Sequence, residues 1–108
     1  MSATLTRIQL LAARGSVRLS DRDYDELAAE GILFSEIEGT VTFCRLIEDH
    51  PNAHAGPTVL VLQRDTDRQP VHVVWGIPAG SDGPAVLVTA YRPDPAKWTK
   101  DFTERVTP

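Results

Sequence analysis

The hydrophobic pattern of the chain changes its period at about residue 42, from a helical spacing to the alternation typical of strands. Apolar residues recur every three or four positions in 3–13 and again after Ser20, which suits a helix N-cap because acidic residues follow it in the first turn. A shorter third helix is predicted from Ser35, and residues 16–19 suit a brief strand. We therefore expect the first third of the chain to be mainly helical.

Four apolar or β-branched segments follow, TFCRLIEDH (42–50), TVLVLQR (58–64), PVHVVWGI (70–77) and PAVLVTAY (84–91). Clusters of Pro, Gly, Asp and Asn separate them, as is typical of strands joined by turns. The connections are too short for parallel crossovers, which need about a dozen residues, so an antiparallel meander is expected. Asp94 and Pro95 then favour a closing helix that runs to about Glu104.

These elements predict an α+β fold, with N-terminal helices followed by a four-stranded antiparallel sheet and a short C-terminal helix. The 108 residues suit a single domain (1–108), in which 1–14 form an N-terminal helix and 15–105 form the core. No apolar stretch approaches the roughly 18 residues of a membrane-spanning helix. The N-terminal apolar segment contains Arg7 and does not resemble a signal peptide, so a cytoplasmic protein is expected.

The negative charge of the chain is concentrated in one segment. The formal net charge is −4, but residues 20–50 carry nine acidic residues against two arginines. An acidic protein is a poor general binder of nucleic acid, although a local basic patch is compatible with this composition. The single cysteine, Cys44, has no partner for an internal disulfide and is expected to be a half-buried core residue of a protein in a reducing compartment.

His72 is the most unusual residue in the strand region, because it interrupts a hydrophobic run. Alternation places it on the sheet face opposite Trp75. It could act as a general acid or base, or it could form a structural hydrogen bond across the sheet. Tyr91 and Arg92 should emerge where the next strand ends; Arg92 could bind a phosphate or simply pair with Asp94.

Other polar residues have both a chemical and a structural interpretation. Glu48 and Asp49 could be acid/base carboxylates or a solvated strand end, and Trp98 with Phe102 could stack on nucleobases or clamp the closing helix. The segment HPNAH (50–54) has two histidines four positions apart, but its proline disfavours the helix that a zinc site of this spacing needs. Walker, GxGxxG, GxSxG and CxxC motifs are absent, so no cofactor and no metal are expected.

The segments RLIEDHP, GPTVLVL, RQPVHVVWGI, VLVTAYRPDPAKW and DFTER occur in this order between about Gly15 and Arg105. In sequence and spacing they resemble the small bacterial family of domain of unknown function 4258. In that family the first capped helix usually carries a histidine where this chain has Arg22, and arginines where it has Glu26 and Glu30. These differences remove one titratable group and turn a basic helix acidic.

The resemblance implies a relation to the RelE/ParE-like toxin superfamily, some members of which cleave messenger RNA on the ribosome. It implies a toxin–antitoxin role with an antitoxin-like protein as partner, RNA as a possible target and metal-independent cleavage. His72 would be base or acid, Arg92 and Arg105 would hold the phosphate, and Tyr91 would position or protonate. The alternative is a noncatalytic protein-binding module that uses the acidic helical surface to bind a basic partner.

Overall fold

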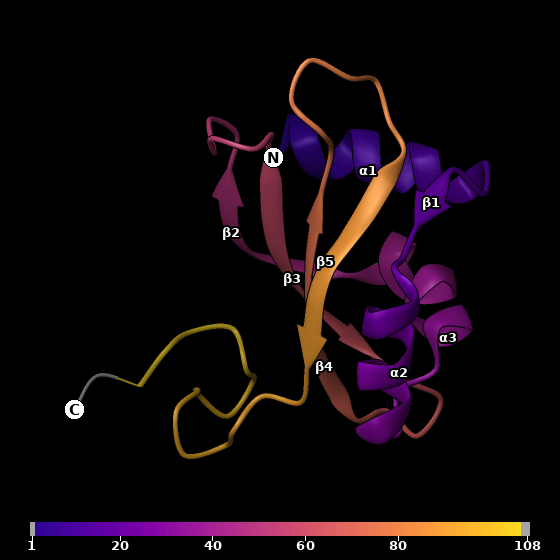
Figure 1. The fold of residues 1–108 in the computed structure, drawn as a ribbon. Helices are drawn as coiled ribbons and strands as arrows, with labels where there is room; N and C mark the ends of the chain where they lie inside the picture. Colours follow the sequence, from indigo (N-terminus) through magenta and orange to yellow (C-terminus); the bar gives the residue numbers. More distant parts are fainter. Residues whose placement is uncertain (1, 107–108) are drawn as a thin grey trace.

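The computed structural model describes residues 2–106 and has an α+β architecture, with helices on one face of a single sheet (Figure 1). The helical elements are α1 (Ala3–Ala13), α2 (Asp21–Ala29), α3 (Phe34–Thr40) and the 3-10 helix η1 (Val41–Phe43). The strands are β1 (Val17–Arg18), β2 (Arg45–His50), β3 (Thr58–Arg64), β4 (Pro70–Gly76) and β5 (Ala85–Tyr91). Among the described residues, no helix has both the length and the hydrophobicity needed to cross a membrane.

The predicted Ser20 cap of α2 is present, and α1 has a similar capping bond, which was not predicted from the sequence. The Ser20 hydroxyl accepts a hydrogen bond from the backbone N–H of Asp23 at 3.1 Å, and Ser2 does the same for Leu5 at 3.0 Å. Each bond satisfies an N–H group that has no partner within the helix. The third helix begins at Phe34, not after a Ser35 cap as the sequence suggested, and it has no side-chain capping bond.

The sheet has five strands in the order β1-β5-β4-β3-β2, so the predicted four-stranded antiparallel sheet is wrong. Strands β2 to β5 do form the expected antiparallel meander. The additional strand β1 pairs in parallel with β5, with Val17 opposite Ala85. A two-residue strand has too few positions to show which partner it takes, and this partner lies far along the chain.

The predicted closing helix is also wrong, because residues 92–106, called the C-terminal segment below, form turns. Phe102 has a φ of 62°, which a right-handed helix excludes. The backbone N–H of Thr99 bonds to the carbonyl of Glu104 at 2.8 Å, which closes a loop rather than a helical turn. The Asp101 carboxylate accepts bonds from Thr99 and Thr103, so side chains compete here with helical hydrogen bonding.

The hydrophobic core lies between the helices and one face of the sheet. From the sheet it takes Val61, Val73 and Trp75, and from the helices Ile8 and Ile37, all of them fully buried. The opposite face, called the outer face below, is the one on which His72 lies. Figure 1 shows the C-terminal segment on the left of the sheet and α2 and α3 on its right.

One buried polar residue, Gln63, joins the core to the end of α3. Its amide nitrogen donates to the carbonyl of Ile37 at 2.7 Å and to the hydroxyl of Thr40 at 2.9 Å. Its amide oxygen accepts a bond from the indole N–H of Trp75 at 2.8 Å. The side chain is therefore fully used in fixing α3 and Trp75 to β3.

Candidate functional site

His72 lies in the middle of β4 and has no exposed surface. Its Nε2 lies 2.8 Å from the carbonyl oxygen of Phe102, and because a carbonyl only accepts, Nε2 carries the proton. Its Nδ1 lies 3.4 Å from the Tyr91 hydroxyl, which can donate to it. The Trp98 ring meets the imidazole edge-on, with 4.3 Å between the centroids. The C-terminal segment therefore covers the histidine completely.

Charge and burial around this histidine favour the neutral imidazole. Removal from water lowers the pKa of His72, and the nearby Arg105 lowers it further, whereas the bond to Phe102 and the charge of Glu48 oppose the change. Burial also raises the pKa of Tyr91. Both groups are therefore uncharged at neutral pH.

A carboxylate and a guanidinium complete this part of the outer face. Glu48, in β2, accepts a bond from Arg105 Nη1 at 3.0 Å and lies 3.1 Å from His50 Nε2. The Arg105 guanidinium also lies 5.1 Å from the centre of the Trp98 ring. Glu48, His72, Tyr91, Trp98 and Arg105 are called the outer-face cluster below. It joins acid/base groups with a cation, but its histidine is out of reach of a substrate while the C-terminal segment is in place.

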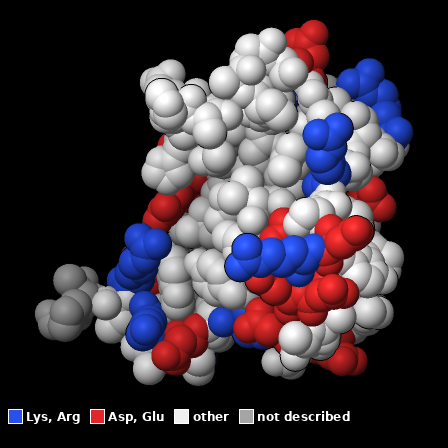
Figure 2. Space-filling view, in the orientation of Figure 1, with Lys and Arg blue, Asp and Glu red and all other residues white. Residues whose placement is uncertain are grey.

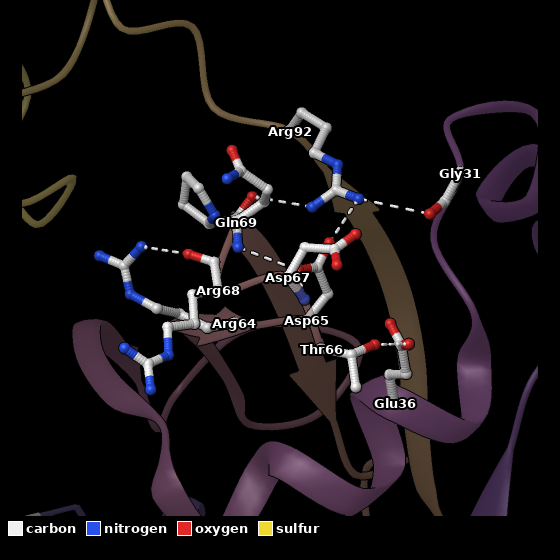
Figure 3. A network of polar contacts seen from close by, with 10 residues as sticks. Gly31, Glu36, Arg64, Asp65, Thr66, Asp67, Arg68, Gln69 and Arg92 are labelled. Carbon is white, nitrogen blue, oxygen red and sulfur yellow. Dashed lines mark hydrogen bonds and ion pairs between the residues drawn. The ribbon is translucent and has the colours of Figure 1, made fainter.

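Arg92 belongs to a different network, at the end of the sheet (Figure 3). Its Nη2 lies 2.8 Å from Asp65 Oδ2 and donates to the carbonyl of Gly31 at 3.3 Å, while Nη1 donates to that of Pro70 at 3.4 Å. The contact with Gly31, between α2 and α3, shows that Arg92 turns to the helical side. The structure thus brings His72, Tyr91 and Arg105 together and directs Arg92 elsewhere.

The partner of Arg92 is Asp65, not the neighbouring Asp94 considered from the sequence. The Asp65 side chain is only 6% exposed, and its Oδ1 accepts the backbone N–H groups of Asp67 and Gln69, both at 2.9 Å. Burial alone would raise the pKa of Asp65, but these hydrogen bonds and Arg92 together lower it. The turn sequence DTDRQ indicates a side-chain-stabilised turn, yet it carries no signal for a partner 27 residues away.

The surface of α2 and its neighbour α3 is rich in carboxylates. Figure 2 shows acidic side chains gathered where α2 lies in Figure 1, with a few basic side chains among them. The acidic residues of the two helices and of the turn after α2 are Asp21, Asp23, Asp25, Glu26, Glu30, Glu36 and Glu38, called the acidic surface below. Arg22 neutralises one of them through its bond to Glu26 at 3.1 Å. Two large apolar side chains of the same region are exposed, Tyr24 at 57% and Leu33 at 56%.

The remaining candidates from the sequence have structural roles here. Among residues 2–106, no three His, Cys, Asp or Glu side chains come together as metal ligands. His50 bonds to Glu48 rather than to His54. Cys44 is partly buried against Gln9, and burial raises the pKa of its thiol to about 11.

The fold and site define a small α+β domain with an acidic helical layer and a histidine–tyrosine pair enclosed on the outer sheet face. The family Domain of unknown function (DUF4258) matches residues 23–92, which is more than half of the chain, and the chain belongs to that family. The matched region runs from α2 to Arg92 and includes His72 and Tyr91. Neither a curated protein nor a solved structure matches the chain.

Proposed function

We propose that the protein is a noncatalytic protein-binding module that uses its acidic surface to bind a basic partner protein. The observation that carries this proposal is the combination of exposed carboxylates with two exposed apolar side chains, Tyr24 and Leu33, on the same helical layer. Aromatic and apolar anchors contribute most of the affinity of protein interfaces, whereas surrounding charges steer the partner and select it.

The state of the catalytic candidates supports a binding role over an enzymatic one. A general acid or base must come within hydrogen-bond reach of its substrate. His72 has no exposed surface, and both of its ring nitrogens already have partners within the protein. Arg92, the expected phosphate ligand, has its charge balanced by Asp65.

The proposal is tested with a basic amphipathic helical peptide, which presents lysines around an apolar stripe, as a stand-in for the partner. We expect NMR shift changes centred on α2 and the turn at Leu33, with an affinity that falls about tenfold or more between 50 and 300 mM salt. Tyr24→Ala and Asp25→Asn should each weaken binding. Asp82→Asn, which removes a carboxylate from the β4–β5 loop, is the control and should not.

An affinity that is the same in Tyr24→Ala, Asp25→Asn and the unaltered chain would contradict the proposal. So would shift changes centred on the outer face. An acidic peptide of the same length and apolar pattern serves as the second control and should not bind.

A toxin-like ribonuclease of the RelE/ParE-like superfamily, held in check by an antitoxin-like partner in the cytoplasm, is the second candidate. The convergence of His72, Tyr91 and Arg105 favours it, because these groups could supply acid/base chemistry and phosphate binding. In such an enzyme His72 would transfer protons at the ribose 2′-hydroxyl and leaving oxygen, and Arg105 would stabilise the phosphorane. The C-terminal segment would first have to leave the imidazole.

Growth arrest on expression is the test of this second candidate. The arrest should be lost in Tyr91→Phe and Arg105→Gln, which change the cluster without opening a large cavity. It should persist in Arg22→Gln, a control on exposed α2. Expression of the folded protein without any effect on growth would contradict the ribonuclease.

A further inference from the structure

A cavity of about 410 Å³ lies where η1 enters β2, beside the C-terminal segment. It contains none of the residues of the acidic surface or the outer-face cluster. Its lining residues are Thr40, Phe43, Arg45, Leu62, Gln63, Arg64 and Asp101. They come from three parts of the chain, namely the α3–β2 region, β3 and the C-terminal segment.

One wall of this cavity is an aromatic ring that the fold leaves in water. Phe43 is 84% exposed, the largest exposed fraction among the large hydrophobic residues of the described chain. Its side chain adds nothing to the core, where such a ring would contribute roughly 2 kcal/mol or more by burial. An exposed ring at the rim of a cavity is a surface on which a planar ligand can stack.

Two arginines, Arg45 and Arg64, line the same cavity as this ring. Arg45 pairs with Leu62 across β2 and β3, so that Arg45, Leu62 and Arg64 share the outer face. In the described part of the chain neither arginine forms an ion pair, and Arg64 donates only to the carbonyl of Arg68, at 2.9 Å. Figure 3 shows Arg64 extending away from the pair of Asp65 and Arg92. Neither cation is held by a carboxylate within ion-pair distance, although the charge of Arg45 acts on Asp101 in the same cavity.

The last polar group of the cavity is the Asp101 carboxylate, in which only Oδ1 accepts hydrogen bonds from the described residues. Asp101 Oδ1 accepts the hydroxyls of Thr99 and Thr103, each at 2.7 Å, and the backbone N–H of Thr103 at 3.2 Å. No group in residues 2–106 donates to Oδ2. The bond from Thr99, then those from Thr103, lower the pKa of Asp101 to about 2, so the group is an acceptor at any physiological pH.

We propose that this cavity binds a nucleoside phosphate whose base carries an exocyclic amino group. The base stacks on Phe43, its amino group donates to Asp101 Oδ2, and Arg45 and Arg64 bind the phosphate. Guanidinium groups bind phosphate oxygens through paired hydrogen bonds, and carboxylates accept from base amino groups. An apolar ligand would leave the two cations without a partner, and a simple anion would not use the ring.

The test compares cytidine and uridine 5′-monophosphate, which share ring size and phosphate but differ in the amino group. We expect millimolar or tighter binding of the cytidine compound by NMR titration, with a clear preference over uridine. Phe43→Ala should weaken binding by about tenfold, and Arg45→Gln and Arg64→Gln should each weaken both ligands. Asp101→Asn should reduce the preference for cytidine. Arg22→Gln, which removes an arginine from exposed α2, is the control and should bind normally.

A second experiment distinguishes a free nucleotide from a nucleic acid strand, since both present a base and a phosphate. A short single-stranded oligocytidine that binds no more tightly than the mononucleotide indicates that the ligand is a free nucleotide. Much tighter binding of the oligocytidine indicates a nucleic acid strand. Either result supports the proposal. No binding of any of these ligands at millimolar concentration would overturn it, as would binding unchanged by Phe43→Ala in a variant with the normal urea midpoint. Because none of these positions belongs to the acidic surface, this outcome is independent of the peptide experiment.

Discussion

The imidazole of His72 donates a hydrogen bond to the carbonyl of Phe102 at 2.8 Å, which fastens the C-terminal segment to the centre of the sheet. The bond joins a strand residue with no exposed surface to a loop residue of left-handed backbone conformation. This bond needs a proton on Nε2, which the neutral tautomer and the imidazolium both carry, whereas the contact with Tyr91 needs Nδ1 free to accept. Protonation at Nδ1 would therefore remove the Tyr91 contact and place a charge under the C-terminal segment, where burial disfavours it.

The stability of the protein should consequently fall in mild acid. Because burial lowers the pKa of His72 from its ordinary 6.5, the unfolded chain binds a proton more readily than the folded one. The stabilisation is complete above about pH 6.5 and is lost as the pH falls towards the lowered pKa of the folded state. Urea unfolding at pH 7.5, 6.5 and 5.5 measures this. The pH dependence should be weaker in His72→Gln, and equal pH dependence in both proteins would contradict the assignment.

The ion pair of Arg92 and Asp65 should be a structural contact. Arg92→Gln leaves a carboxylate whose side chain is only 6% exposed without its cation, and we expect a loss of about 1–2 kcal/mol in the free energy of unfolding. The double variant with Asp65→Asn should recover part of this loss. Chemical denaturation of the four proteins in a double-mutant cycle gives the coupling energy, and a value near zero would show that the contact is not stabilising.

Gln63 should be intolerant of a hydrophobic replacement of similar size. Gln63→Leu removes the partners of the Trp75 indole N–H and of the Ile37 carbonyl, both in the core, and should cost about 2–4 kcal/mol. Gln63→Glu keeps one acceptor for Trp75 but places a carboxylate beside the Ile37 carbonyl, so it should also destabilise. Tryptophan fluorescence during urea unfolding measures both. A stability of Gln63→Leu within 0.5 kcal/mol of the unaltered protein, roughly the effect of an ordinary surface change, would contradict this.

Cys44 should react slowly with thiol reagents. The nucleophile is the thiolate, and burial raises the pKa of this thiol to about 11, so its thiolate fraction at pH 8 is about two orders of magnitude below that of an ordinary cysteine. The rate of reaction with a disulfide reagent, compared with glutathione in the same buffer, tests this. In urea the rate should rise to that of an unstructured peptide, and equal rates in the folded and unfolded protein would contradict the expectation.

Patterns among neighbouring residues were sufficient to predict α1 and β3. The bounds of α1 and β3 agree with the sequence, because helical spacing and an uninterrupted β-branched run are signals carried by adjacent residues. Alternation likewise placed His72 on the face opposite Trp75. The prediction failed for 94–104. Asp94 Oδ1 does accept the backbone N–H of Ala96 at 2.9 Å, but only a turn follows, and Asp101 and Thr103 then form side-chain bonds with the backbone and with each other.

The candidate site likewise has one part that the sequence could predict and another that it could not. Tyr91 opposite His72 follows from strand register, and the sequence could suggest that the two residues are neighbours. The partners of Arg92, by contrast, come from the loop after α2 and the β3–β4 turn, which only the folded chain brings together. The Phe43 cavity was missed because its residues are separated by up to 61 positions and carry no shared motif.

The parallel pairing of β1 with β5 also has a consequence for synthesis on the ribosome. Val17 is translated long before Ala85, so the first strand has no edge to join until the last strand has emerged. Until then the meander of β2 to β4 can assemble, but neither β5 nor its parallel neighbour β1 can join it. Completion of this sheet is thus a late event in biogenesis, and a nascent chain stalled before residue 85 would keep its first strand unpaired.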